Sequence, residues 1–180
     1  MKTPQCFAAL VASLAIAASA SAAPIVFNVN LNGANEITGG AASGDLNGSA
    51  IGTITLDAGS GGSTATASWN FTLANLATPP ATDFHIHTGV ATTQGSVFIG
   101  FGVNTGAGDI LTATQFTGSR TGLSSANMTT VLANPAGFYL NIHNGEFPGG
   151  AVRGQVPEPS TAILVLGSLG ALGFRRRRTS

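Results

Sequence analysis

Three histidines carry the chemistry that this sequence could perform. His85 and His87 alternate in the run 84–88, and His143 ends a second apolar run that begins at Phe138. Residues two apart in a β-strand point to the same face, so His85 and His87 would face together, and His143 would lie opposite the apolar side of its own strand. If the two strands are neighbours, three imidazoles converge. Such a ligand set suits Zn²⁺ or Cu²⁺.

The alternative interpretation gives the histidines a structural role only. Partly buried imidazoles often tie loops to strands through hydrogen bonds. The two interpretations differ in geometry, because ring nitrogens more than about 5 Å apart cannot share one ion at bond lengths of about 2.0–2.1 Å. Asp83, two residues before His85, could accept a hydrogen bond from an imidazole, or it could be a turn residue after Pro79-Pro80.

No other set of residues supports catalysis, and we expect that the protein is not an enzyme. The serines lack the Gly-x-Ser-x-Gly turn of a hydrolase, and the glycine-rich segment 59–62 lacks the lysine and following helix of a phosphate-binding loop. The single cysteine, Cys6, lies in the expected export signal, so the mature chain would have no thiol nucleophile and no disulfide. Glu146 and Arg153 are expected to form a weak surface ion pair.

Residue patterns predict that strands position the histidines. Apolar and polar side chains alternate in 25–32, and Trp69, Phe71 and Leu73 alternate toward an expected core. The segments 48–57 and 63–73 flank a glycine-rich turn and predict a hairpin. Further strands are predicted at 83–87, 96–101, 110–116, 138–143 and 151–155.

These segments predict an all-β fold, an antiparallel Greek-key-like β-sandwich or barrel with one short helix. The helix is predicted at 123–133, where Ser124 or Ser125 can cap its start and Pro135 lies just past its end. Hydrophobic helices are expected at both ends of the chain.

Charge is unevenly distributed, although the formal net charge of the chain is zero. Between residues 24 and 156 only Arg120 and Arg153 are basic, against six acidic residues, so this part has no lysine and a net charge of −4. Nucleic-acid binding needs cations to neutralise phosphates, so a nucleic-acid partner is excluded. Disorder is excluded as well, because 43% of the residues are hydrophobic and 8% are charged.

Both ends of the chain predict export and sorting. Residues 1–22 have the basic start, apolar stretch and small-residue end of a signal peptide, which leaves one domain at 23–156 and a tail at 157–180. In the tail, an uncharged apolar segment follows a proline-rich break. A basic run then follows, which would hold the end at the cytoplasmic side of the membrane. The break is formed by Pro157, Glu158 and Pro159, and the basic run by Arg175, Arg176, Arg177 and Arg178.

Residues 156–178 resemble the PEP-CTERM sorting signal of Gram-negative bacteria in motif, apolar helix and basic tail. The resemblance implies export, transient anchoring in the inner membrane, and recognition near Pro157–Pro159 by an exosortase-type membrane protease. The protein would then reach the cell surface or extracellular matrix. In that family the signal accompanies exopolysaccharide and biofilm export, so exopolysaccharide or other surface proteins are the implied partners. An ordinary C-terminal membrane anchor is the alternative.

Three runs in the middle of the chain resemble the CHRD domain over roughly residues 25–156. They are 31–36 (LNGANE), 84–89 (FHIHTG), and 139–144 (YLNIHN) leading into 147–155 (FPGGAVRGQ). Two positions depart from the usual pattern: Ile37-Thr38 stand where a proline is usual, and Ala151 where a glutamate is common. The resemblance implies a β fold more than an activity.

A His-x-His strand with a later histidine is also similar to the copper half of a copper/zinc superoxide dismutase, itself an antiparallel sandwich. The chain has no fourth histidine to bridge two metals and no cysteine pair, so dismutation by two metals is not expected. The sequence therefore predicts an exported CHRD-domain protein, a binding or structural module associated with exopolysaccharide or biofilm. The alternative is a secreted copper- or zinc-binding protein, or a mononuclear redox enzyme, that uses His85, His87 and His143.

Overall fold

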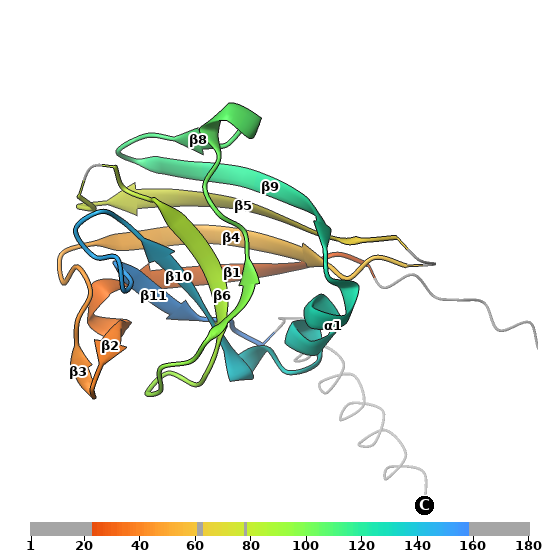
Figure 1. Ribbon diagram of the computed structural model, residues 1–180, viewed down its shortest axis with the longest axis horizontal. Coiled ribbons are helices and arrows are strands. Elements are labelled where there is room, and N and C mark those ends of the chain that lie inside the picture. The colour runs from red at the N-terminus through yellow and green to blue at the C-terminus, as the bar shows by residue number, and fades with distance from the viewer. Residues whose placement is uncertain (1–22, 61–62, 78, 159–180) are drawn as a thin grey trace, which may run out of the picture.

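A single curled antiparallel sheet forms the body of the protein. The computed structural model describes residues 23–60, 63–77 and 79–158, and within them nine strands pair edge to edge (Figure 1). Their order across the sheet is β7 (Val97–Gly100), β6 (Asp83–Thr88), β10 (Phe138–His143), β11 (Val152–Gln155), β1 (Ile25–Asn32), β4 (Ser49–Asp57), β5 (Ala65–Ala74), β9 (Gln115–Leu123) and β8 (Ile110–Leu111).

Short elements complete the described part of the fold. A two-stranded flap pairs β2 (Ile37–Thr38) with β3 (Ala41–Ala42). The α-helix α1 (Ser125–Ala133) leads from β9 toward β10, and 3-10 turns occur at η1 (Gly33–Asn35), η2 (Thr105–Ala107) and η3 (Pro135–Gly137). The flap and α1 lie at opposite ends of the sheet (Figure 1).

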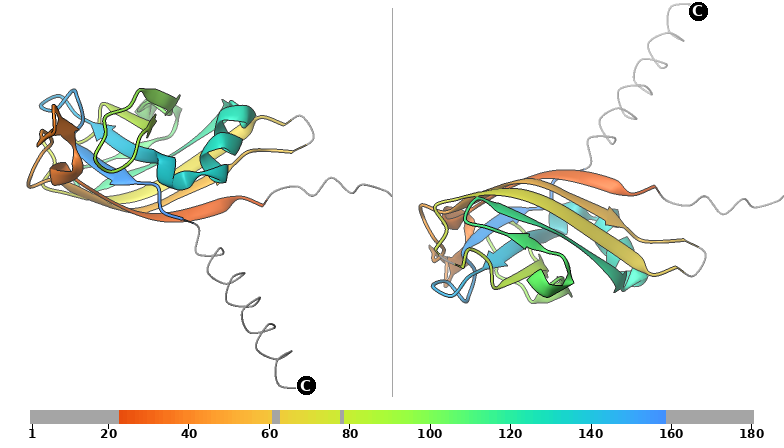
Figure 2. Two further views of the ribbon diagram at one scale, coloured as in Figure 1. Left: turned by 90° about the horizontal axis from the view of Figure 1, so that it is seen from below. Right: turned by 90° about the horizontal axis from the view of Figure 1, so that it is seen from above.

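The sheet curls until its two halves face each other across the core, and the views of Figure 2 show this from the side. Phe84 of β6 contacts aromatic rings that lie far away in strand order. Its ring centroid is 5.2 Å from that of Trp69, 5.6 Å from Phe71 and 5.6 Å from Phe116. All four side chains are at most 2% exposed, so one aromatic cluster joins both halves.

The antiparallel β architecture expected from the sequence is confirmed, but the strands form one sheet rather than two stacked ones. The reason is β11, which pairs with β10 on one side and with β1 on the other and so connects the two halves by hydrogen bonds. The result is a curled half-barrel with a single α-helix among the described residues. The expected likeness to the superoxide dismutase fold stays a prediction.

Most of the expected strands are present, with the expected faces inward. Phe27, Val29 and Leu31 of β1 are buried, and so are Trp69, Phe71 and Leu73 of β5, as the alternation predicts. The hairpin of β4 and β5 is in register from Ser49 opposite Ala74 to Asp57 opposite Thr66. The helix begins after Ser124, whose hydroxyl accepts a hydrogen bond from the backbone N–H of Asn127 at 3.2 Å, and ends before Pro135.

One predicted strand differs from the structure. The segment 110–116 is split into the two-residue β8 and the start of β9, which runs on to Leu123, where the helix was expected to begin. Residues 117–122 show no apolar alternation, and their strand conformation comes from pairing with β5. Pairing with a neighbouring strand therefore determines this element, and local sequence does not.

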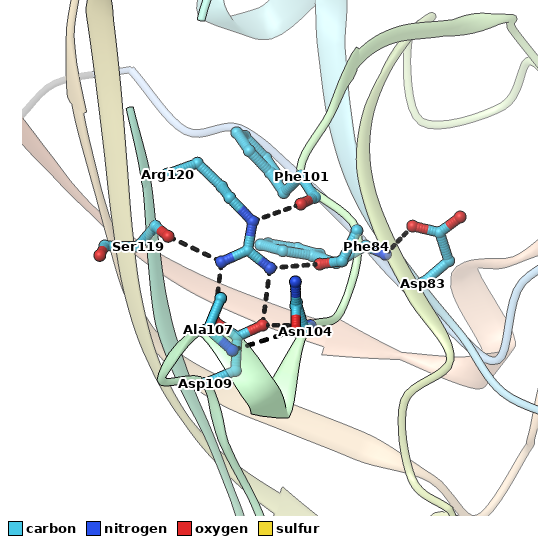
Figure 3. A network of polar contacts seen from close by, with 9 residues as sticks. Asp83, Phe84, Phe101, Asn104, Ala107, Asp109, Ser119 and Arg120 are labelled. Atoms are coloured by element: carbon cyan, nitrogen blue, oxygen red, sulfur yellow. Dashed lines mark hydrogen bonds and ion pairs between the residues drawn. The ribbon is translucent and has the colours of Figure 1, made fainter. Parts of the chain in front are cut away.

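A salt bridge ties the segment between the two edge strands of the sheet, β7 and β8, to the neighbouring strand β9 (Figure 3). Arg120 of β9 contacts both carboxylate oxygens of Asp109, at 2.7 and 2.6 Å, and donates from Nε to the carbonyl of Phe101 at 2.7 Å. The second Asp109 oxygen also accepts from the backbone N–H of Asn104 at 2.7 Å. The guanidinium lies 5.1 Å from the Trp69 ring centroid, so this clasp ties the segment after β7 to β9 above the aromatic core.

Removing the charge of the clasp is expected to destabilise the fold. Asp109→Asn should lower the free energy of unfolding by about 3 kcal/mol at neutral pH, because Arg120 loses its ionised partner. The hydrogen bond from Arg120 holds the pKa of Asp109 below its usual 3.8, so this contribution is present above that pH and is lost as pH falls through the lower folded pKa. Thermal unfolding measured across pH should show the two proteins converging in acid.

Glu146→Gln is the matched control, because Glu146 is exposed on a loop. It should leave stability nearly unchanged. Equal losses in the two variants, or an Asp109→Asn deficit that persists in strong acid, would contradict the clasp.

Candidate metal centre

The register of β6 against β10 brings the three histidines together. Asp83 lies opposite His143, His85 opposite Asn141, and His87 opposite Tyr139. Phe84 and Ile86 point into the core, so the histidines share the other face, as the alternation predicts. His85 Nδ1 lies 3.2 Å from His143 Nε2, and one ring nitrogen from each histidine lies within 4.8 Å of those of the other two. The cluster therefore meets the 5 Å condition.

The face that carries the histidines is buried rather than open to water. Loops cover it, and Glu36, Asn141 and Arg153 there are only 1–2% exposed. His87 is 7% exposed, whereas His85 and His143 are partly exposed at the edge of this polar layer. A buried polar layer is costly unless its groups are paired, so each hydrogen bond within it constrains the imidazoles.

Backbone carbonyls fix the tautomers of two of the histidines. His87 Nδ1 lies 3.0 Å from the carbonyl oxygen of Gly95, and His143 Nδ1 lies 2.9 Å from that of Pro148. A carbonyl oxygen only accepts, so both Nδ1 atoms carry the proton, and in the neutral ring Nε2 keeps its lone pair. His87 Nε2 is buried and has no hydrogen-bond partner within the described residues.

A carboxylate fixes the third histidine in the opposite tautomer. Asp83 Oδ2 lies 2.9 Å from His85 Nε2, and its Oδ1 accepts from the backbone N–H of Phe84 at 2.8 Å. The proton of neutral His85 is therefore on Nε2, and the lone pair is on Nδ1, the atom that faces His143 Nε2. This is the contact that the sequence suggested for Asp83, and the role in orienting a metal ligand stays a prediction.

These hydrogen bonds leave lone pairs of the histidine rings facing one another, an arrangement that a cation would stabilise. In the neutral state His85 Nδ1 and His143 Nε2 present two lone pairs to each other across 3.2 Å, and His87 adds a third unpartnered acceptor. Burial lowers the pKa values of His85 and His87, which favours their neutral form, although Asp83 acts in the opposite direction on His85. A proton or a metal ion between the rings relieves the repulsion.

The spacing suits a metal ion after a small adjustment. Two nitrogens in a tetrahedral shell lie about 3.4 Å apart when each bond is about 2.05 Å, close to the separation of His85 and His143. No two ligands of such an ion can be more than about 4.2 Å apart, so a pair at 4.8 Å must close by more than half an ångström. Imidazole nitrogens are ligands that both Zn²⁺ and Cu²⁺ accept.

Two further polar groups of this layer, Glu36 and Asn141, were not predicted as site residues from the sequence. Glu36 Oε2 accepts from Asn141 Nδ2 at 2.8 Å, and burial raises the pKa of Glu36 while Arg153 and His143 act against the rise. Asn141 shares the face of Tyr139 and His143 by alternation, which could have identified it, but Glu36 comes from a distant segment and no local pattern reveals it.

The predicted ion pair between Glu146 and Arg153 is wrong. Arg153 is 1% exposed and donates to the carbonyls of Val90 and Thr93 at 2.8 and 2.6 Å, whereas Glu146 is exposed on its loop. The reason is register: Arg153 lies opposite Asn141, so its side chain enters the same covered polar layer.

A known protein family covers most of the described fold and all three histidines. The profile of the CHRD domain matches residues 27–156, which include all three histidines and every described strand except the first residues of β1. The chain belongs to the CHRD domain family. A PEP-CTERM protein-sorting motif matches residues 155–178, which include Pro157–Pro159 and the arginines at 175–178. No curated protein and no solved structure matches the chain.

The CHRD domain and the sorting motif together mark an exported protein of Gram-negative bacteria that is sorted to the cell surface. Among the described residues, no helix is long and apolar enough to span a membrane. The expected signal peptide at 1–22 and the apolar and arginine-rich parts of the tail lie outside the described residues.

Asp83 is expected to matter for metal affinity. Asp83→Asn should weaken Zn²⁺ binding about 10–100-fold, because it removes the carboxylate that fixes His85 in the ligand tautomer. Competition against a chelating dye would measure the dissociation constant. Asp57→Asn, at the hairpin turn between β4 and β5, is the control for lost negative charge. Unchanged affinity in Asp83→Asn, or equal weakening in both variants, would argue against the role of Asp83.

Proposed function

We propose that this protein is an exported, non-enzymatic surface protein whose CHRD domain binds one Zn²⁺ or Cu²⁺ ion through His85, His87 and His143. The proposal is supported by the convergence of one ring nitrogen from each of three histidines within 4.8 Å, in a cluster where the other contacts of each ring set its tautomer. A buried imidazole with a structural role alone would have both ring nitrogens hydrogen-bonded, whereas His87 Nε2 has no partner among the described residues.

The metal would be bound to the folded domain as a resident ion. The ligands belong to paired strands of one sheet, and their outer partners are backbone carbonyls and Asp83. These features support a site whose ligands are largely ordered before the ion binds, so that binding requires the small approach of the rings described above and little further ordering. A bound copper ion would also allow one-electron chemistry, which is the mononuclear redox alternative.

A second candidate function is supported by the sorting motif rather than by the histidines. We propose that the export machinery carries the chain out and that an exosortase-type protease processes it near Pro157–Pro159 during transient anchoring in the inner membrane. The CHRD domain then serves as a binding or structural module of the extracellular matrix, in contact with exopolysaccharide or other surface proteins. The PEP-CTERM match at 155–178 supports this proposal, and nucleic acid is not among the proposed partners.

Calorimetry tests the metal proposal directly. Residues 23–156, purified without a histidine tag, should bind one Zn²⁺ or Cu²⁺ ion. His85→Ala and His143→Ala should each weaken binding at least about 100-fold, which exceeds the usual cost of losing an outer partner. Asp57→Asn should bind as the unmodified protein does. Because the chain has only these three histidines, residual binding in the double variant His85→Ala/His143→Ala measures nonspecific sites. Equal binding by all the variants, or none at all, refutes metal binding by this cluster.

Deletion of residues 157–180 tests the sorting proposal. The truncated protein should fail to appear on the cell surface, as measured by antibody labelling of intact cells, and should not be processed. A strain that lacks the protein should form weaker biofilm if the matrix role is correct. Unchanged surface labelling and processing would refute the sorting role, and unchanged biofilm and adhesion would refute the matrix role.

A further inference from the structure

A column of three stacked side chains, Arg153, Tyr139 and His87, crosses the covered polar layer. Arg153 of β11 places its guanidinium carbon 3.4 Å from the ring centroid of Tyr139 on β10. The Tyr139 ring in turn stacks on the His87 ring of β6, with centroids 4.9 Å apart and planes inclined by 14°. A cation on an aromatic face and two stacked rings are attractive contacts, so the column fixes the plane of the His87 imidazole.

Arg153 also holds the loop that covers the column. This loop, residues 89–96, connects β6 to β7, and Arg153 Nη2 donates to its Val90 and Thr93 carbonyls at 2.8 and 2.6 Å. Arg153 is 1% exposed, its Nη1 has no hydrogen-bond partner within the described residues, and burial lowers its pKa. No carboxylate among the described residues forms an ion pair with Arg153. Burying a guanidinium without such a partner is costly, so the contacts that hold this loop come at some expense of stability.

Gly95 is the point where the loop and the metal centre meet. Its carbonyl accepts from His87 Nδ1 at 3.0 Å and from the Tyr139 hydroxyl at 3.4 Å, and its N–H lies 3.3 Å from the same hydroxyl. A Cβ at this position would overlap the Thr88 carbonyl oxygen, at 1.5 Å, so only glycine lets the loop backbone approach β6 this closely. The carbonyl that sets the tautomer of His87 is therefore part of the loop that Arg153 holds.

We propose that Arg153 and Tyr139 are positioning residues of the metal centre. Tyr139 acts on His87 by stacking on its ring, and Arg153 acts through Tyr139 and through the loop 89–96 that carries the Gly95 carbonyl. The inference rests on the proposed metal function. Neither residue offers an atom to the ion in this arrangement: Arg153 has no acceptor, and the Tyr139 hydroxyl contacts Gly95. Their contribution is to hold the Nε2 lone pair of His87 in place before the metal arrives.

The coupling must act in both directions. If a fixed loop favours metal binding, then metal binding must favour the fixed loop by the same free energy. The backbone amides of 90–95 should therefore exchange with solvent more slowly in the metal-loaded protein than in the metal-free protein. A column that only stabilised the fold would change exchange throughout the domain and would show no such dependence on metal.

Two arginines allow a matched test in residues 23–156. Arg153→Met removes the guanidinium of the column and keeps an apolar stem, and Arg120→Met makes the same change in the clasp on the other side of the core. The measurements are the Cu²⁺ dissociation constant, the electron paramagnetic resonance spectrum of bound Cu²⁺, thermal unfolding, and hydrogen exchange of 90–95 with and without metal. Tyr139→Leu removes both the ring and the hydroxyl, whereas Tyr139→Phe removes the hydroxyl alone, so the two variants separate the contributions of these groups. They also test the column if Arg153→Met does not fold.

We expect Arg153→Met and Tyr139→Leu to weaken Cu²⁺ binding about 10–100-fold, to change the Cu²⁺ spectrum and to abolish the metal-dependent protection of 90–95. Tyr139→Phe, which keeps the stacked ring, should restore most of the affinity. Arg120→Met should lower the unfolding temperature but leave the dissociation constant and spectrum unchanged.

Wild-type affinity and spectrum in both Arg153→Met and Tyr139→Leu would overturn the inference, and so would equal weakening in Arg153→Met and Arg120→Met. These outcomes leave metal binding by the wild-type protein intact. They are therefore distinct from failure of the proposed function, in which the wild-type protein itself binds no metal and the inference falls with it.

Discussion

The antiparallel pairing of β6 with β10 is the constraint on which the rest of the structure depends. Its register sets His85 opposite Asn141 and His87 opposite Tyr139, and the same register sends Phe84 and Ile86 into the core. A shift by one residue would exchange the two faces, burying imidazoles among aromatic rings and placing phenylalanine in the polar layer. The aromatic cluster around Phe84 therefore protects the geometry of the histidines, because it makes a register that exchanges the two faces unfavourable.

The half-barrel separates two kinds of interior. On one side of β6 and β10 lies an apolar core that holds the curled sheet together, and on the other lies a covered layer of histidine, asparagine, glutamate and arginine. The apolar side follows from hydrophobic burial alone. The polar side carries a desolvation cost and leaves acceptors such as His87 Nε2 without a partner among the described residues. A layer that costs stability is where a binding function is to be sought.

Alternation alone was enough to predict β1, β5, β6 and β10, to place the histidines on one face and to assign Phe27 and Trp69 to the core. It failed for β9, whose residues 117–122 carry no apolar pattern and become a strand by pairing with β5. It failed also for Arg153, because a lone arginine in a short strand gives no sign that a loop more than 55 residues earlier will cover it. The sequence contains the ligands of the site, and the contacts that orient them depend on tertiary structure.

The end of β11 fixes the point at which the chain leaves the folded domain. Val156 is 1% exposed and its N–H donates to the Phe138 carbonyl at 2.9 Å, so the folded part reaches to within one residue of Pro157. From Phe138, β10 runs about 17 Å to His143, which lies beside Asp83. The chain therefore leaves the described domain at the end of β10 that lies away from the partly exposed edge of the histidine cluster.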